Sequence, residues 1–180
     1  NRPERPLPLN KINPENVLLV SVFLFFLSLF LSLLFHFYIQ LIVFIAILIS
    51  FYYTPVLKKM GLIKNLSISL NVFFSFLCGG LLTDNVMAVI PIACFSFLLI
   101  TYREIIKDLY DYEGDKKNNI RTLTVVWGLK KAWWFAFSSL LVLICSLICS
   151  FLFYNQSFRV LFFLLFFVLI PLLVCSIIIN

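Results

Sequence analysis

Residues 103–121 read REIIKDLYDYEGDKKNNIR, and they hold most of the acidic groups of an otherwise apolar chain. The chain of 180 residues has 8 Asp and Glu, and this stretch contains Glu104, Asp108, Asp111, Glu113 and Asp115. An apolar run, residues 86–100, comes directly before it. If one helix continued from that run through the acidic stretch, all of these carboxylates except Glu113 would lie within about 60° of one another on one face.

Like charges on one helix face repel, so this arrangement favours a bound cation that neutralises them. Mg²⁺ prefers oxygen ligands and is usually held by one or two carboxylates together with phosphate oxygens of a substrate. The spacing alone leaves a second interpretation open, a solvated helix end without a metal. Nearby basic residues would then balance the charge: Arg103, Lys107, Lys116 and Lys117.

The rest of the chain has the composition of a membrane protein. It is 63% apolar and only 12% charged, unlike an ordinary soluble domain. The apolar runs predict an all-α polytopic membrane protein, because only helices satisfy their own backbone in lipid when barrel patterning is absent. We expect about six transmembrane helices, near residues 15–35, 38–57, 65–83, 86–106, 131–153 and 158–179. The net charge of +6 does not indicate a nucleic-acid partner, because the basic residues lie between apolar runs.

The charge distribution predicts how the chain is oriented. With six alternating spans, every Lys and Arg except Arg159 falls on the side that carries Asn1. Loops rich in Lys and Arg face the cytoplasm, so that side is predicted to be cytoplasmic. Every acidic residue except Asp84 falls there too, which places the predicted chemistry on the cytoplasmic face of a cell membrane. A transporter, the alternative of another class, would instead need ionisable groups near mid-membrane, which the span centres lack.

Three segments on this side resemble motifs of the UbiA superfamily of intramembrane prenyltransferases. DLYDYEGD (108–115), continued by KKNNIRTLTVVWG, is similar to the second Asp-rich motif of that family. YTPVLKKMGLIKN (53–65) is similar to its Tyr…Leu-Lys segment, with Tyr53 and Lys58 at the matching positions. NRPERPLP (1–8) resembles the connector that follows its first Asp-rich motif. Within the superfamily, REIIKD (103–108) is most similar to the archaeal lipid branch, the geranylgeranylglycerol-phosphate geranylgeranyltransferases.

The sequence departs from that branch at two places. Leu9 and Asn10 stand where Ser-Gly is usual, and Lys64 stands where Gly commonly precedes Asn65. We expect both departures to lie in loops.

The resemblance implies that residues 1–180 form a single transmembrane prenyltransferase domain, partial with respect to a nine-helix bundle. By the family's layout the chain would hold the third through eighth helices. The first Asp-rich motif would lie upstream of Asn1, so we expect this piece alone to be inactive.

The resemblance also implies roles for individual residues. Asp108, Asp111 and Asp115 would hold Mg²⁺ against the diphosphate of a prenyl donor, and Lys58 and Tyr53 complete the predicted catalytic set. Four further residues are predicted to bind substrate: Arg5, Asn65, Lys107 and Arg121. The implied reaction is Mg²⁺-dependent transfer of a geranylgeranyl group from its diphosphate to a lipid acceptor, geranylgeranylglyceryl phosphate, in ether-lipid synthesis. An aromatic acceptor, as in quinone or chlorophyll pathways, remains the alternative within the superfamily.

Overall fold

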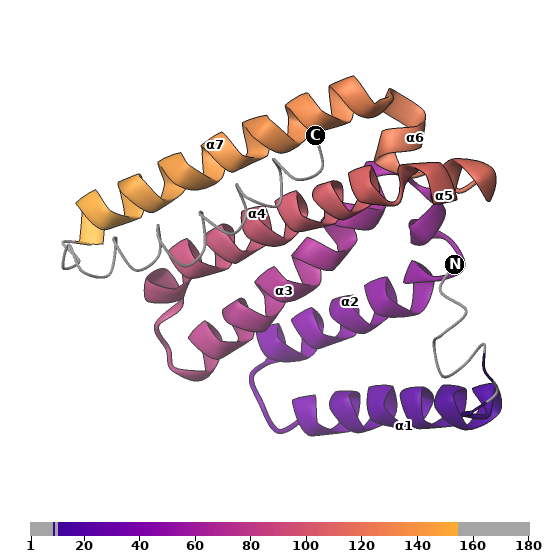
Figure 1. Ribbon diagram of the computed structural model, residues 1–180. Coiled ribbons are helices and arrows are strands. Elements are labelled where there is room, and N and C mark those ends of the chain that lie inside the picture. The colour runs from indigo at the N-terminus through magenta and orange to yellow at the C-terminus, as the bar shows by residue number, and fades with distance from the viewer. Residues whose placement is uncertain (1–8, 10, 155–180) are drawn as a thin grey trace. The chain divides into compact units, whose positions relative to one another are not determined.

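The computed structural model describes Leu9 and residues 11–154, and every element in this part of the chain is a helix (Figure 1). The elements in chain order are α1 (Pro14–Ser32), α2 (Phe37–Tyr53), a short 3₁₀ helix η1 (Leu57–Lys59), α3 (Leu62–Leu82), α4 (Val86–Tyr110), α5 (Tyr112–Lys117), α6 (Leu123–Trp127) and α7 (Leu129–Tyr154). The predicted all-α class is confirmed. The sixth predicted span, 158–179, and the predicted substrate-binding residue Arg5 lie outside the described residues.

Four of the described helices are long and apolar enough to cross a bilayer: α1, α3, α4 and, over Leu129–Ser146, α7. α2 is apolar but has only 17 residues. The prediction that it runs to residue 57 is wrong, because it ends at Tyr53. Pro55 explains this end, since proline disfavours helical backbone at the residue before it. The chain then turns through η1 into α3.

The chain divides into two compact units, residues 1–51 and 52–180, which we describe separately. The first contains α1 and all but the end of α2. α1 begins at Pro14, a residue suited to the first turn because its missing N–H has no partner there anyway. Asn13 caps the helix by accepting a hydrogen bond from the Glu15 amide at 3.0 Å. The prediction of one domain over residues 1–180 stays a prediction.

The second unit is organised around α4, which packs against α3 and α7. α3 approaches α4 closely at Gly80, where an added Cβ would lie 3.1 Å from the Val86 Cα. Farther along, Thr101 donates a hydrogen bond to the Ser69 hydroxyl across the two helices at 2.8 Å. The apolar core lies mainly between α4, α6 and α7 and consists of Tyr102, Ile105, Leu109, Leu123, Ala132, Ala136, Leu140 and Leu143.

Burial in the second unit is inverted relative to a soluble protein. Its buried groups include many polar ones: Lys64, Asn65, Ser67, Ser69, Thr101, Glu104, Asp108, Thr122 and Thr124. Large apolar side chains such as Met87 and Ile92 are exposed. An apolar exterior matches a lipid environment, and polar groups inside membrane helices usually serve function.

α4 does not run without interruption through the acidic stretch. It extends past the predicted end at 106 to Tyr110, and α5 begins at Tyr112. Asp111 lies between them with φ −84° and ψ 3°, outside ordinary helical geometry. The single helix assumed for a common acidic face is therefore interrupted at Asp111, between α4 and α5.

Candidate functional site

The candidate site lies at one end of the second unit, where α3 begins, α4 ends, and α5 and α6 follow (Figure 1). A backbone hydrogen bond from the Gly61 N–H to the Arg121 carbonyl, 2.9 Å long, joins the loops before α3 and α6. Gly61 has φ +51°, and an added Cβ would lie 3.6 Å from the Arg121 carbonyl oxygen. A positive φ strains other residues, so glycine suits this crossing. Segments about sixty residues apart thus meet at one end of the bundle.

Asp108 is the centre of this end, and it is already paired. Its side chain is 2% exposed, and its Oδ1 accepts a charge-assisted hydrogen bond from the Lys64 ammonium. Its Oδ2 accepts a hydrogen bond from the Asn65 side-chain amide at 3.1 Å. Both partners lie in the first turn of α3. The expectation that Lys64 lies in a loop is wrong, because α3 begins at Leu62 and points this lysine into the bundle.

α6 is fastened to the same residue through the backbone. The Thr124 hydroxyl donates to the Asp108 carbonyl oxygen at 3.0 Å, and it lies 3.1 Å from the Thr122 hydroxyl. Both threonines are buried. Asp108 of α4 therefore joins three helices. Its carboxylate is bonded to α3, and its backbone carbonyl is bonded to α6.

Asp111 and Asp115 differ from Asp108 in burial and in partners. Both are half-buried, and the Asp115 amide donates to the Asp111 carbonyl at 2.9 Å, which sets the two residues one turn apart. Among the residues that the structure describes, neither carboxylate accepts a hydrogen bond or forms an ion pair. These two carboxylates are available to a ligand, and Asp108 is not.

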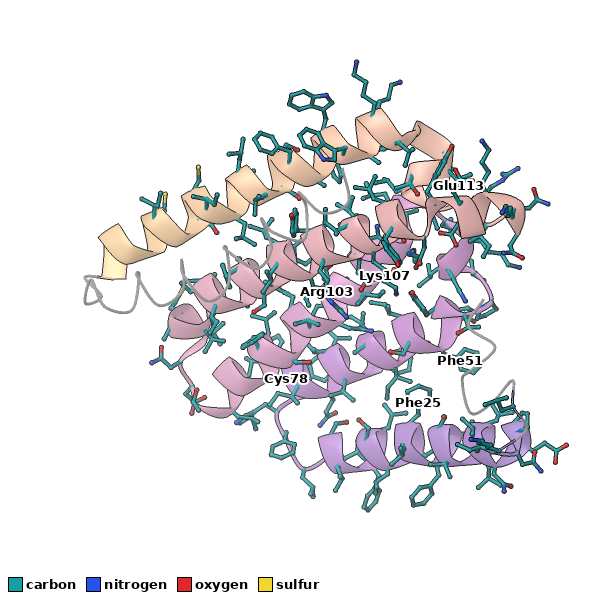
Figure 2. All side chains as sticks on the ribbon, in the orientation of Figure 1. Phe25, Phe51, Cys78, Arg103, Lys107 and Glu113 are labelled. Atoms are coloured by element: carbon teal, nitrogen blue, oxygen red, sulfur yellow. The ribbon has the colours of Figure 1, made fainter. Side chains whose placement is uncertain are left out.

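Glu104 lies one turn before Asp108 on α4 and is 3% exposed. Arg103 contacts its Oε1 at 3.3 Å, and the Lys107 ammonium lies 3.6 Å from its Oε2. Both cations are themselves largely exposed, and Figure 2 shows them on α4, with Glu113 on α5 beyond the break. Lys107 therefore lies at the surface, one turn from the buried Glu104, and its role in substrate binding stays a prediction.

The structure brings most of the other predicted residues to this end. Tyr53 is half-buried at the end of α2. Lys58, in η1, and Arg121, before α6, are exposed on loops linked by the Gly61 hydrogen bond. Asn65 is fully buried, and its Oδ1 has no hydrogen-bond partner within the described part of the chain.

The donor set fits a divalent cation only in part. Within Leu9 and residues 11–154, no three His, Cys, Asp or Glu side chains are placed to hold a metal ion together. The three aspartates of the acidic motif thus do not form a ready-made triad. Asp111 and Asp115 do fit Mg²⁺, which needs only one or two carboxylates when substrate phosphate supplies the remaining ligands.

The sequence placed Lys64 and Thr124 within the resembled segments, but it did not predict that either residue contacts Asp108. Lys64 was visible only as a departure from a resembled motif, and its partner is 44 residues away. Thr124 has no signal of its own. The only clue in the sequence is the position of Lys64 next to the start of an apolar span. A lysine buried there must be paired with an opposite charge.

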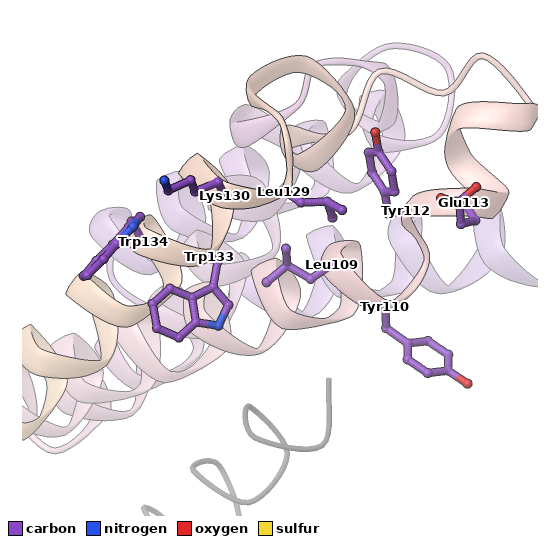
Figure 3. Close-up of a pocket in the computed structure, with 8 residues that line it drawn as sticks. All are labelled: Leu109, Tyr110, Tyr112, Glu113, Leu129, Lys130, Trp133 and Trp134. Carbon is purple, nitrogen blue, oxygen red and sulfur yellow. The ribbon is translucent and has the colours of Figure 1, made fainter. Parts of the chain in front are cut away.

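A separate cavity of about 640 Å³ lies between the end of α4, α5 and the start of α7 (Figure 3). Aromatic side chains line much of it, among them Tyr110, Tyr112, Trp133 and Trp134. None of the three aspartates of the motif lines this cavity. It adjoins the acidic stretch without including the polar cluster around Asp108.

Comparison with known proteins identifies the family. The profile of the UbiA prenyltransferase family matches residues 1–179. The chain belongs to the UbiA prenyltransferase family.

Individual relatives of this UbiA chain share one name. Digeranylgeranylglyceryl phosphate synthase of Methanosphaera stadtmanae is 34% identical over 155 residues, which are 86% of this chain and 57% of that protein. The synthase of the same name from Saccharolobus solfataricus is 35% identical over 86% of this chain and 56% of its own length. A solved structure described as digeranylgeranylglyceryl phosphate synthase in membranes is similar with a TM-score of 0.72 at 32% identity, over 99% of this chain and 61% of the other. This UbiA chain thus spans somewhat more than half the length of the relatives it matches.

Proposed function

We propose that the protein transfers a geranylgeranyl group from its diphosphate to the hydroxyl of geranylgeranylglyceryl phosphate, an ether-lipid precursor. The observation that carries this proposal is a pair of available carboxylates, Asp111 and Asp115, at the polar end of an otherwise apolar helix bundle. The names of the relatives support the choice of donor and acceptor.

The exposed basic residues at this end suit the diphosphate of the donor. Lys58 is exposed on η1, Lys107 on α4 and Arg121 in the loop before α6. Arg5 is proposed to join them. Asp111 and Asp115 would hold Mg²⁺, which would supply positive charge to stabilise the leaving diphosphate. The basic side chains add to the same stabilisation, and fixed charges of this kind are among the largest contributions to catalysis.

The reaction breaks the allylic C–O bond and releases the diphosphate. The acceptor hydroxyl oxygen then bonds to the allylic carbon and loses its proton. Tyr53 is half-buried at the end of α2, and its ring is proposed to face a developing allylic cation. Asn65 Oδ1 has no hydrogen-bond partner among the described residues, and it is proposed as a buried acceptor for a hydroxyl donor. The apolar helices take up the isoprenoid chains and keep water from the cation.

The site is proposed to face the cytoplasm. Its basic residues belong to the loops that carry nearly all the Lys and Arg of the chain. Positive loops of this kind stay on the cytoplasmic side.

The test is an acceptor comparison with the complete natural protein that carries this sequence, in membranes with Mg²⁺ and labelled geranylgeranyl diphosphate. Geranylgeranylglyceryl phosphate and 4-hydroxybenzoate are offered separately to the wild type, to Asp111→Ala and to Glu113→Ala. Glu113 is a matched control, an exposed carboxylate two residues away. We expect transfer to the glycerol lipid, lost in Asp111→Ala and kept in Glu113→Ala. Transfer only to the aromatic acid would contradict the proposed acceptor, and transfer to neither would contradict the proposed reaction.

A further inference from the structure

We infer that Lys64 is a built-in counter-ion that holds Asp108 out of metal coordination, so that Asp108 is a positioning residue and Asp111 and Asp115 bind the divalent cation. This inference rests on the proposed function, since it concerns the metal that the donor diphosphate needs. It goes beyond the sequence-based prediction, in which all three aspartates of the motif are ligands.

The first argument is the occupancy of the Asp108 carboxylate. One oxygen accepts from the Lys64 ammonium and the other from the Asn65 amide at 3.1 Å. With 2% of the side chain exposed, the carboxylate has little contact with solvent. Mg²⁺ keeps several waters and requires near-octahedral geometry, so it needs room that this carboxylate lacks. A metal could reach it only by displacing the ammonium.

The second argument is that Lys64 is not an ordinary loop lysine. Lys58 and Lys59 nearby are exposed, as topology-setting charges usually are. Lys64 is 7% exposed and lies in the first turn of α3. Burying an ammonium is costly unless a carboxylate pairs with it. Lys64 is therefore committed to Asp108 and is not a free charge for the diphosphate.

The third argument is what the pair fastens together. Lys64 and Asn65 join α3 to the last turns of α4, and Thr124 joins α6 to the Asp108 carbonyl at 3.0 Å. The break at Asp111 comes immediately afterwards, followed by Asp115 on α5. Asp108 is therefore fixed in place and neutralised by Lys64. It holds the end of α4, from which the segment with Asp111 and Asp115 continues, and it adds no net charge to those two carboxylates.

The test measures metal binding in the complete natural protein in detergent micelles. Mn²⁺ serves as the probe, followed by electron paramagnetic resonance, with a non-reactive thio analogue of geranylgeranyl diphosphate present. The variants are Asp108→Asn, Asp111→Asn, Lys64→Met and the double variant Lys64→Met/Asp108→Asn. Thermal unfolding of each variant is recorded alongside, and Asp108→Asn keeps the shape of the side chain in case Lys64→Met does not fold.

We expect Asp108→Asn to change the Mn²⁺ affinity less than about 2-fold while lowering the unfolding temperature, and Asp111→Asn to weaken binding by about 10-fold or more. Lys64→Met, where it folds, should strengthen Mn²⁺ binding, and the double variant should abolish that gain. If Asp108→Asn weakens binding as much as Asp111→Asn does, the inference is overturned and the proposed function stands. If the wild type binds no Mn²⁺ with the analogue, the proposed function fails, and this inference fails with it.

Discussion

Replacing Lys64 by Met tests the energetics of the buried pair at the start of α3. The substitution keeps an unbranched side chain of similar length but removes the ammonium from the Asp108 carboxylate, which is 2% exposed. Breaking a buried ion pair from one side costs about 3 to 5 kcal/mol, mainly because the remaining charge stays buried. Asn65 still donates one hydrogen bond at 3.1 Å. We therefore expect a loss of stability near the lower end of that range.

The assay is reversible unfolding in mixed micelles, with the free energy of unfolding obtained for a complete double-mutant cycle. Lys64→Met/Asp108→Leu replaces both charges by apolar groups, a change that is often close to neutral. The double variant should recover all but about 1 kcal/mol of the stability lost in Lys64→Met, and that remainder is due to the lost Asn65 hydrogen bond. Lys59→Met is the matched control, an exposed lysine five residues away. Its effect should stay within about 0.5 kcal/mol.

Two results would refute this reasoning. One is a loss below about 1 kcal/mol in Lys64→Met, because a buried carboxylate left without its cation cannot cost so little. The other is additivity of the two single substitutions, since paired residues show a coupling energy of about 0.5 to 3 kcal/mol.

Three further predictions follow from the same packing. Gly80→Ala should destabilise the fold by about 1 to 3 kcal/mol, because its Cβ would lie 3.1 Å from the Val86 backbone. Gly79→Ala has open space at its Cβ and should not destabilise the fold. Equal unfolding temperatures for the two variants would contradict the close approach of the helices. Thr124→Val should cost about 1 kcal/mol through the lost hydrogen bond to Asp108, measured by the same unfolding assay, and no loss would argue against that bond. Removing divalent cations with EDTA should abolish prenyl transfer but leave the helical circular dichroism unchanged, because Asp111 and Asp115 lie outside the buried cluster. Loss of both signals would mean that the metal supports the fold.

The sequence predicted the membrane class and most helices because both follow from the length of uninterrupted apolar runs. It also predicted that Tyr53, Lys58 and the acidic motif belong together, through a resemblance that spans three segments. It did not predict the break at Asp111, since a run of residues with helical spacing gives no sign of where one peptide unit departs from the helix. It placed Lys64 in a loop, because a charge in an apolar setting marks a span boundary unless its partner is known. That partner, Asp108, lies 44 residues away and is found only in three dimensions.

The central claim is that Asp111 and Asp115 hold the donor diphosphate through a divalent cation. The most direct measurement is equilibrium binding of labelled geranylgeranyl diphosphate to the complete natural protein, with and without Mg²⁺, in the wild type and in Asp111→Asn/Asp115→Asn. We predict Mg²⁺-dependent binding that the double substitution weakens by at least about 10-fold while thermal unfolding stays unchanged. Binding that is equally tight without Mg²⁺, or unaffected by the double substitution, would contradict the claim.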